Sequence, residues 1–136
     1  MSDVESFFDT NVLLYLLSDD TRKADRVEAL LQHPAAISVQ VLNEFTAVAT
    51  RKLGLSLAEV REVLDTARTL CTTHPITTDT HDLGLRMMQQ YRFSLYDSMI
   101  VASALRAGCT VLYSEDLQHG QVIEGRLTIL NPFKSK

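Results

Sequence analysis

The chain has 136 residues, of which 46% are hydrophobic and 22% are charged, so its length and composition are those of a single globular domain. No apolar run approaches the roughly 18 residues of a membrane span, and the acidic start lacks the basic stretch of a secretory signal, so we expect a cytoplasmic protein with no membrane segment. The formal net charge of −4 lacks the basic excess typical of nucleic-acid-binding proteins. It reflects either simple solubility or acids gathered around a metal.

The two cysteines, Cys71 and Cys109, lie far apart, and neither belongs to a Cys-x-x-Cys motif. This spacing argues against a disulfide framework and against a zinc ribbon. Cys71 falls on an apolar stripe and Cys109 lies next to a predicted strand. We therefore expect both to be buried thiols.

In the first half of the chain, short apolar runs alternate with helical patterns. Asp19, Asp20 or Thr21 can cap a helix that Pro34 ends, and Ser38 can cap a helix that stops at Gly54. The expected elements are a strand over 4–8, an apolar helix beginning at residue 11, a helix from about 21 to 33, a strand over 35–37 and a helix from 39 to about 52.

The second half is mostly helical and closes with short strands. Ser56 and Glu59 fit a capping box, and Pro75 marks a break with a short extended segment. The expected elements are helices over 57–71, from 78 or 80 to 91 and over 95–107, and strands over 110–113 and 128–130.

This alternation predicts the fold class. Short apolar strands separated by amphipathic helices indicate an α/β domain with a mainly parallel central sheet and helices on both faces. Repeats, linkers and low-complexity tracts are absent from the sequence, so we interpret residues 1–136 as one domain.

Four acids are the candidate functional residues. Asp9 directly follows the first strand, and Asp116 comes three residues after the strand that ends at Tyr113. Asp97 lies in the first turn of a helix and Glu44 about two turns into another. Because ligands of parallel α/β sheets bind beyond the carboxyl ends of the strands, all four acids can reach one edge of the sheet.

Each acid also has a purely structural interpretation. Asp97 can complete a capping box with Ser94, Asp9 can cap the helix that follows it, and Asp116 can be an ordinary turn residue. Glu44 can be a surface residue, although its neighbours are strongly apolar. Four such acids on one edge carry more weight than any one of them.

Clustered carboxylates repel one another and favour a cation between them. Oxygen-only ligands suit Mg²⁺ or Mn²⁺, and the histidines (His33, His74, His81 and His119) show no zinc-ligand spacing. A bound Mg²⁺ can activate water and neutralise phosphate charge. The sequence therefore predicts a site for phosphodiester hydrolysis.

Four segments resemble the motifs of the PIN-domain family. They are residues 7–15 (FFDTNVLLY), 41–45 (VLNEF), 94–104 (SLYDSMIVASA) and 112–116 (LYSED). Each motif is weak alone, but together they cover nearly the whole chain in the expected order. One departure is Glu115, where many relatives carry a basic or small residue, and it leaves open whether Glu115 or Asp116 faces the metal. We favour Asp116.

The compact length resembles the VapC type within that family. The resemblance implies a Mg²⁺- or Mn²⁺-dependent endoribonuclease, the toxin of a toxin–antitoxin pair. It implies a small antitoxin partner that also binds operator DNA, and a homodimer or a larger toxin–antitoxin assembly. The resemblance places the catalytic and metal-binding acids at Asp9, Glu44, Asp97 and Asp116, with Asn11 and Ser114 as supporting polar residues. Asp9 and Asp97 are the expected direct ligands, whereas Glu44 and Asp116 bind directly or through water.

An acidic nuclease still needs basic residues to hold RNA. The candidates are Arg22, Lys23, Arg26, Arg51, Lys52, Arg86 and Arg92. The alternative is that these residues simply lie on solvent-exposed faces of helices. Apolar residues around helix ends can either fill the core or dock a dimer partner or an antitoxin helix; they are Leu30, Leu31, Leu53, Leu55 and Leu57.

Three other functions remain open from the sequence. A PIN-domain nuclease that processes RNA without being a toxin has the same site. A catalytically silent PIN-like binding module would retain the fold without cleavage. A phosphate-binding doubly wound domain such as a receiver or phosphatase is disfavoured, because the segment after the first strand is Asp-x-Asn and a glycine-rich phosphate loop is missing.

Overall fold

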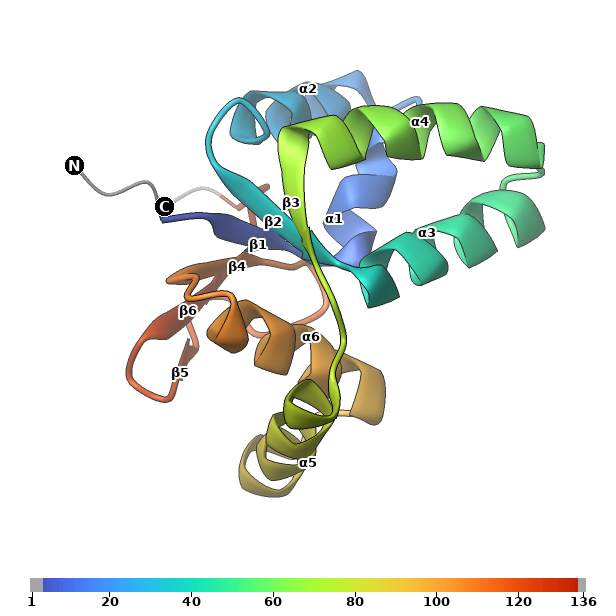
Figure 1. Ribbon diagram of the computed structural model, residues 1–136. Coiled ribbons are helices and arrows are strands. Elements are labelled where there is room, and N and C mark those ends of the chain that lie inside the picture. Colours follow the sequence, from blue (N-terminus) through green and yellow to red (C-terminus); the bar gives the residue numbers. More distant parts are fainter. Residues whose placement is uncertain (1–3, 135–136) are drawn as a thin grey trace.

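A computed structural model describes residues 4–134 as one α/β domain (Figure 1). Its strands are β1 (Ser6–Phe8), β2 (Ala35–Ser38), β3 (Cys71–His74), β4 (Val111–Tyr113), β5 (Val122–Ile123) and β6 (Leu127–Leu130). Its helices are α1 (Thr10–Leu13), the 3₁₀ helix η1 (Leu14–Leu17), α2 (Thr21–Leu30), α3 (Val39–Arg51), α4 (Leu57–Leu70), α5 (Thr78–Tyr91) and α6 (Leu95–Arg106).

The six strands form one sheet in the order β3-β2-β1-β4-β6-β5. All neighbouring strands are parallel except β5 and β6, which pair antiparallel. The chain builds outward from β1 to β2 and β3 on one side and then returns to place β4 on the other. The strand order therefore reverses between β1 and β4, and this is the switch point where ligands bind in such sheets.

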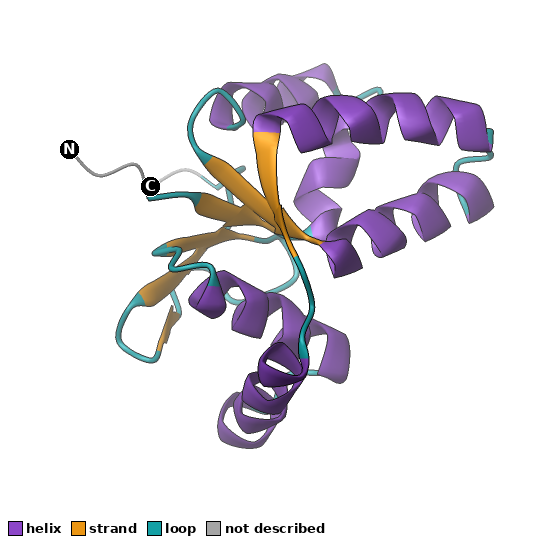
Figure 2. Ribbon diagram, viewed as in Figure 1, coloured by secondary structure: helices purple, strands orange, loops and turns teal. Residues whose placement is uncertain are grey.

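Helices cover both faces of the sheet (Figure 2). Helices α1, α2 and α4 lie on one side, and α5 and α6 lie on the other (Figure 1). Helices α3 and α4 form a hairpin that projects beyond the sheet. The predicted α/β class, with a mainly parallel sheet between two helical layers, is confirmed.

The core is centred on β1 and its neighbours. Phe7 and Phe8 are fully buried, as are Ile37 of β2 and Leu112 of β4. Each such side chain contributes roughly 1.5–3 kcal/mol through removal from water. The strands that end at the switch point are therefore anchored in the core. None of the helices over residues 4–134 is both long and apolar enough to cross a membrane.

The capping predictions are confirmed at most helix starts. Asp20 caps α2 by accepting from the Lys23 N–H at 3.2 Å, Ser38 caps α3, and Ser56 and Glu59 form the expected capping box of α4. Gly54, just beyond α3, has a φ of 69°, the left-handed conformation that favours glycine after a helix.

Two element predictions were wrong. The helix expected over 57–71 ends at Leu70, and Cys71 begins β3, which pairs with β2 over four residues. The extended segment expected at Pro75-Ile76 therefore begins four residues earlier, at Cys71. Hydrogen bonding to β2 outweighs the helical spacing of apolar residues that continues through Cys71. Strand β5 was not predicted because it has only two residues. Cys71 and Cys109 are nevertheless free and buried, as expected.

Candidate active site

Asp9 lies where β1 ends, at the switch point of the sheet. Its backbone N–H donates to the Tyr113 carbonyl at 2.9 Å, which ties the end of β1 to β4. Its side chain caps α1 by accepting from the Thr10 N–H at 2.7 Å. Only 5% of Asp9 is exposed. The helix-capping role expected for Asp9 is thus confirmed. Capping uses only one carboxylate oxygen, so the second oxygen is available for other contacts.

Ser114 and Asn11 contact that second oxygen. The buried Ser114 hydroxyl donates to Asp9 Oδ2 at 2.8 Å, and Asn11 Nδ2 donates to the same oxygen at 3.4 Å. Ser114 Oγ also accepts from the backbone N–H groups of Asp116 and Leu117. The structure therefore brings both proposed supporting residues against Asp9, and Ser114 joins Asp9 to the loop that carries Asp116.

Glu44 reaches the same place from α3. Thr10 Oγ1 donates to Glu44 Oε1 at 2.7 Å, and Gln40 Nε2 donates to Glu44 Oε2 at 3.3 Å. Gln40 also donates to the Tyr96 carbonyl at 3.0 Å, which links α3 to the start of α6. The sequence reasoning missed Thr10 and Gln40. The available signals were the position of Thr10 between Asp9 and Asn11, and the four-residue spacing of Gln40 and Glu44 on one helix face.

Asp97 and Asp116 complete the group. Asp97 is half-buried in the first turn of α6, where its N–H donates to the Ser94 hydroxyl at 3.2 Å. Burial raises the pKa of the Asp97 carboxyl, a hydrogen bond between that carboxyl and the Ser94 side chain lowers it, and the negative charge of Asp116 raises it. Asp116 is exposed in the loop after β4.

Glu115 faces away from this group. Its carboxylate accepts from the Tyr15 hydroxyl at 2.7 Å and pairs with Lys23 Nζ at 3.1 Å. Of the two neighbouring acids that the sequence left unresolved, Asp116 therefore interacts with Asp97, whereas Glu115 already has a cation.

Asp9 carries the largest electrostatic cost of the four. Burial raises its pKa to about 7, hydrogen bonds from Ser114 and Thr10 oppose the rise, and the charges of Asp97 and Glu44 add to it. Within residues 4–134, no Lys, Arg or His pairs with Asp9, Glu44, Asp97 or Asp116. The four carboxylates share one region without a compensating cation from the described chain.

The donor chemistry of this group fits a hard divalent cation. All donors are carboxylate oxygens, the ligands of Mg²⁺ and Mn²⁺. Three acidic, histidine or cysteine side chains do not come close enough together anywhere in the described part of the chain to form a ready-made metal cage. Mg²⁺ does not require one, because it is usually bound by one or two carboxylates and keeps several waters.

The candidate basic residues have different surroundings. Arg22, Lys23 and Arg26 line one hollow beside α2. Arg51 and Lys52 are exposed at the end of α3, Arg86 lies 3.8 Å from Glu124, and Arg92 ends α5 with a φ of 61°. Among these candidates, the α2 group brings three cations to one described cavity.

The apolar residues singled out at helix ends also differ. Leu31 is buried, and Leu30 and Leu55 pack against the core. Leu53 and Leu57 are 51% and 61% exposed at the tip of the α3–α4 hairpin. Of the five, only these last two are free to dock a partner.

The fold and the site together define a doubly wound α/β domain with a group of acids at its topological switch point. The family model described as PIN domain matches residues 6–124, so the chain belongs to the PIN domain family. No curated protein sequence matches the chain significantly.

Solved structures with the same fold include several toxins. The chain is 22% identical to a chain of a toxin–antitoxin complex from Klebsiella pneumoniae, with a TM-score of 0.73, covering 96% of this chain and all of the other. It is 16% identical to VapC20 from Mycobacterium tuberculosis, described as a sarcin-ricin loop cleaving toxin, with a TM-score of 0.69 and coverage of 90% and 99%. It is 17% identical to a chain of VapBC2 from Rickettsia felis bound to promoter DNA, with a TM-score of 0.67 and coverage of 93% and 97%. At these identities the likeness establishes the fold.

Proposed function

We propose that the protein is an endoribonuclease that uses Mg²⁺ or Mn²⁺ to hydrolyse RNA phosphodiester bonds. The observation that carries this proposal is the buried carboxylate of Asp9, which faces two further acids and has no basic partner within residues 4–134. A protein retains such an arrangement at a cost in stability unless a cation binds there.

Asp9 and Asp97 are the proposed direct ligands, and Glu44 and Asp116 bind directly or through water. A cation bound there neutralises phosphate charge and makes water a stronger nucleophile. The chain itself fixes the acids. Ser114 and the Thr10 N–H hold the two oxygens of Asp9, and the Thr10 hydroxyl holds Glu44, so Thr10 couples both acids.

The surroundings also favour an anionic substrate once a cation is present. Asp97 lies in the first turn of α6, where unpaired backbone N–H groups and the helix dipole attract negative charge. Asp116 is exposed and so is accessible to a substrate in solvent. RNA can therefore approach from the side of α6 and the β4 loop.

The test is cleavage of total RNA by the wild type and by Asp9→Asn, with Mg²⁺ and again with EDTA. We expect cleavage by the wild type with Mg²⁺ only, and a loss of about 100-fold or more in Asp9→Asn. Asp65→Asn, which changes an exposed acid of α4, is the matched control and should cleave normally. Full activity of folded Asp9→Asn, or cleavage in EDTA, would contradict the proposal.

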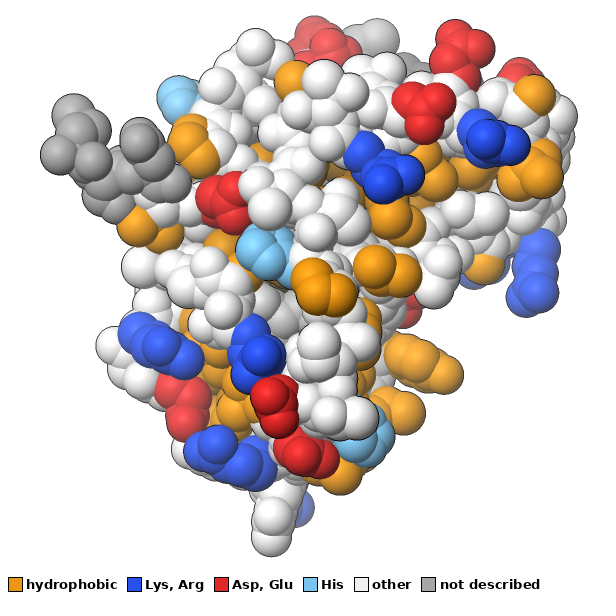
Figure 3. Space-filling view, viewed as in Figure 1, with side chains coloured by type: hydrophobic (Ala, Val, Ile, Leu, Met, Phe, Trp, Pro, Cys, Tyr) orange, Lys and Arg blue, Asp and Glu red, His pale blue; other side chains and the backbone are white. Residues whose placement is uncertain are grey.

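We further propose that the nuclease is a cytoplasmic, homodimeric toxin silenced by a small antitoxin. Its likeness in fold to toxin–antitoxin complexes supports this. So does a hollow of about 520 Å³ beside Asn11 and Glu115, whose lining includes Leu14, Leu17, Val48 and Leu53. Figure 3 shows further apolar side chains on the surface of the α3–α4 hairpin. Such apolar surface is typical of sites that bind a partner helix.

Expression of the chain alone should arrest growth, and co-expression with the product of a neighbouring gene for a small DNA-binding protein should restore it. Asp9→Asn should not arrest growth. Normal growth despite RNA cleavage by the purified protein would indicate an RNA-processing nuclease instead of a toxin.

A further inference from the structure

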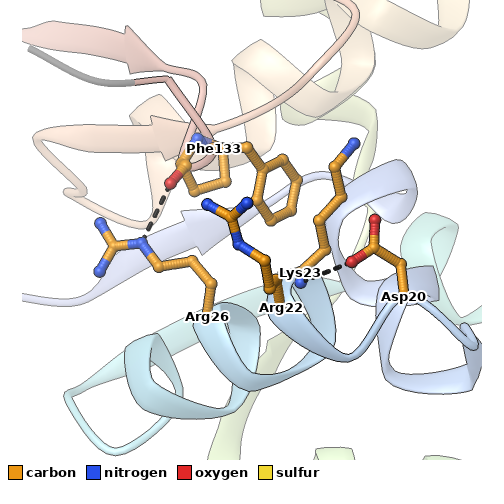
Figure 4. A pocket seen from close by; sticks show the side chains of 6 residues that line it. Asp20, Arg22, Lys23, Arg26 and Phe133 are labelled. Atoms are coloured by element: carbon orange, nitrogen blue, oxygen red, sulfur yellow. Dashed lines mark hydrogen bonds between the residues drawn. The ribbon is translucent and has the colours of Figure 1, made fainter.

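A second hollow lies between α2 and the segment that follows β6. It has a volume of about 450 Å³ and is lined by Asp20, Arg22, Lys23, Arg26, Pro132 and Phe133. Figure 4 shows that Arg22 and Lys23 rise from α2 toward Phe133, whereas Arg26 turns aside to the Pro132 carbonyl. Three cations and one acid therefore face a cavity in a protein whose net charge is −4.

Arg22 and Arg26 are the cations without an acid partner. Arg22 has no hydrogen-bond or ion-pair partner among residues 4–134. Arg26 Nε donates to the Pro132 carbonyl at 3.0 Å, which holds the guanidinium beside the C-terminal segment. The two residues are one helical turn apart, a spacing at which like charges destabilise a helix. An anion between them would remove that repulsion and accept from their free N–H groups.

The nearby acids do not neutralise this pair. The Asp20 carboxylate caps α2 by accepting from the Lys23 N–H. The Glu115 carboxylate pairs with Lys23 Nζ. The charge of Lys23 is thus neutralised by Glu115, and Arg22 and Arg26 carry the remaining positive charge of the hollow.

Aromatic surface adjoins these cations. The ring of Phe133 lies 4.9 Å from that of Tyr15 in an edge-on arrangement, and Lys23 Nζ lies 5.0 Å from the centre of the Phe133 ring. These contacts fix Phe133 at the wall of the hollow. Arginines that bind phosphate beside an aromatic ring that stacks on a base are the usual elements of single-strand recognition.

Hydrogen bonds connect the hollow to the acidic site. Asn11 contacts both Asp9 Oδ2 and the Glu115 N–H. Glu115 in turn contacts Tyr15 and Lys23. The two regions are therefore linked through Asn11 and Glu115, and we expect a strand whose reacting phosphate lies near Asp9 to extend toward α2.

We propose that this hollow is a subsite for single-stranded RNA, in which Arg22 and Arg26 bind a phosphate flanking the cleaved bond and Phe133 contacts the adjacent base. The assignment of RNA as the ligand depends on the proposed nuclease function. Binding at the hollow is nevertheless measurable without cleavage, which separates the two.

The first experiment measures binding of a fluorescent single-stranded RNA of about ten nucleotides in EDTA, with Asp9→Asn as the background so that no cleavage occurs. Adding Arg22→Gln and Arg26→Gln should weaken binding about 10-fold and reduce the slope of log K against log salt by about one. Arg61→Gln with Arg68→Gln on α4 removes the same charge from another surface and should change binding less than about 2-fold. Equal losses in both pairs, or no loss in the α2 pair, would overturn the proposal.

The second experiment places the base. RNA carrying a single 5-iodouracil, scanned along the strand, should form a photochemical cross-link to the peptide that contains Phe133, and Phe133→Leu should abolish it. Cross-links confined to other peptides would overturn the proposal.

The third experiment uses the active protein, in which Arg22→Gln with Arg26→Gln should raise KM more than it lowers kcat. If the wild type cleaves RNA but the α2 pair changes neither binding nor KM, the subsite is refuted and the nuclease function stands. If the α2 pair and the cross-link behave as expected but the wild type cleaves no RNA, the subsite stands as a binding site and the nuclease function is refuted.

Discussion

Asp9 and Glu115 follow neighbouring strands at the same edge of the sheet, and the Asn11 side chain contacts both residues, yet their surroundings are opposite. Glu115 has Lys23 and Tyr15 as partners, so its charge is neutralised within the fold. Asp9 is buried beside other acids, and its pKa is raised to about 7. The comparison shows that one acid has its charge neutralised within the fold, whereas the other carries an electrostatic cost whenever it is ionised.

The sharpest test of this contrast is the pH dependence of stability without metal. A pKa of about 7 in the folded protein, against 3.8 for a free aspartate, means that the unfolded chain releases the Asp9 proton first as the pH rises. The wild type should therefore lose up to roughly 4 kcal/mol of unfolding free energy between about pH 4 and pH 7, and no more from this group above it. Asp9→Asn lacks this loss.

Urea unfolding in EDTA at pH 4.5, 6 and 8 measures the difference between the two proteins. Excess Mn²⁺ at pH 8 should restore stability to the wild type and not to Asp9→Asn. If the unfolding free energy of the two proteins changes with pH in the same way, ionised Asp9 does not destabilise the fold.

The next largest effect separates Asp97 from Glu115 in catalysis. Asp97→Asn removes a proposed ligand and should lower RNA cleavage by about 100-fold or more. Glu115→Gln removes only a partly exposed ion pair and should lower cleavage less than about 5-fold. Initial rates of RNA cleavage at saturating Mg²⁺ measure the loss in each variant relative to the wild type. A loss in Glu115→Gln as large as that in Asp97→Asn would contradict the purely structural role given to Glu115.

A smaller effect is expected from Ser114→Ala. Loss of this hydroxyl removes a hydrogen bond that lowers the pKa of Asp9, so the pKa rises further and Mn²⁺ binding at pH 7 weakens about 10-fold. Isothermal titration calorimetry measures this change. Ser98→Ala is a matched control, because the Ser98 hydroxyl is buried and has no hydrogen-bond partner among residues 4–134. Equal Mn²⁺ affinity in the two variants would remove Ser114 from the site.

The smallest effect concerns the pair that is already neutralised. A double-mutant cycle with Lys23→Gln and Glu115→Gln should give a coupling of about 1 kcal/mol or less, because both side chains remain partly exposed. Thermal unfolding of the four proteins provides the cycle. A coupling of several kcal/mol would make Glu115 as strongly held as Asp9 and would remove the contrast.

Helix prediction from the sequence succeeded where local signals were strong. The capping residues Asp20, Ser38 and Ser56 act through contacts within three residues, so the sequence contains all that is needed. The strand at Cys71–His74 was missed because its partner, β2, lies far away in the sequence and the local pattern continues that of α4. Pairing between distant segments has no local signal.

The acids show the same division. Their number, their spacing and their positions after strands or at helix starts indicate one edge of a sheet, and the structure brings charges from all four into one region. The orientation of adjacent loop residues cannot be inferred in this way. The family motif favours Asp116 over Glu115, but only the contacts of Glu115 with Tyr15 and Lys23, which come from a different part of the chain, show where Glu115 lies.

The sequence by itself therefore determined the α/β class, the helix boundaries set by caps, and the four candidate acids, because these follow from periodicity, capping chemistry and strand order. Only the tertiary structure decided which acid is left uncompensated, which is paired with Lys23, and that Arg22 and Arg26 meet Phe133 in one cavity. Burial and charge pairing depend on side chains that are distant in the sequence. The cost stored at Asp9, which is the strongest pointer to function, is a property of the fold.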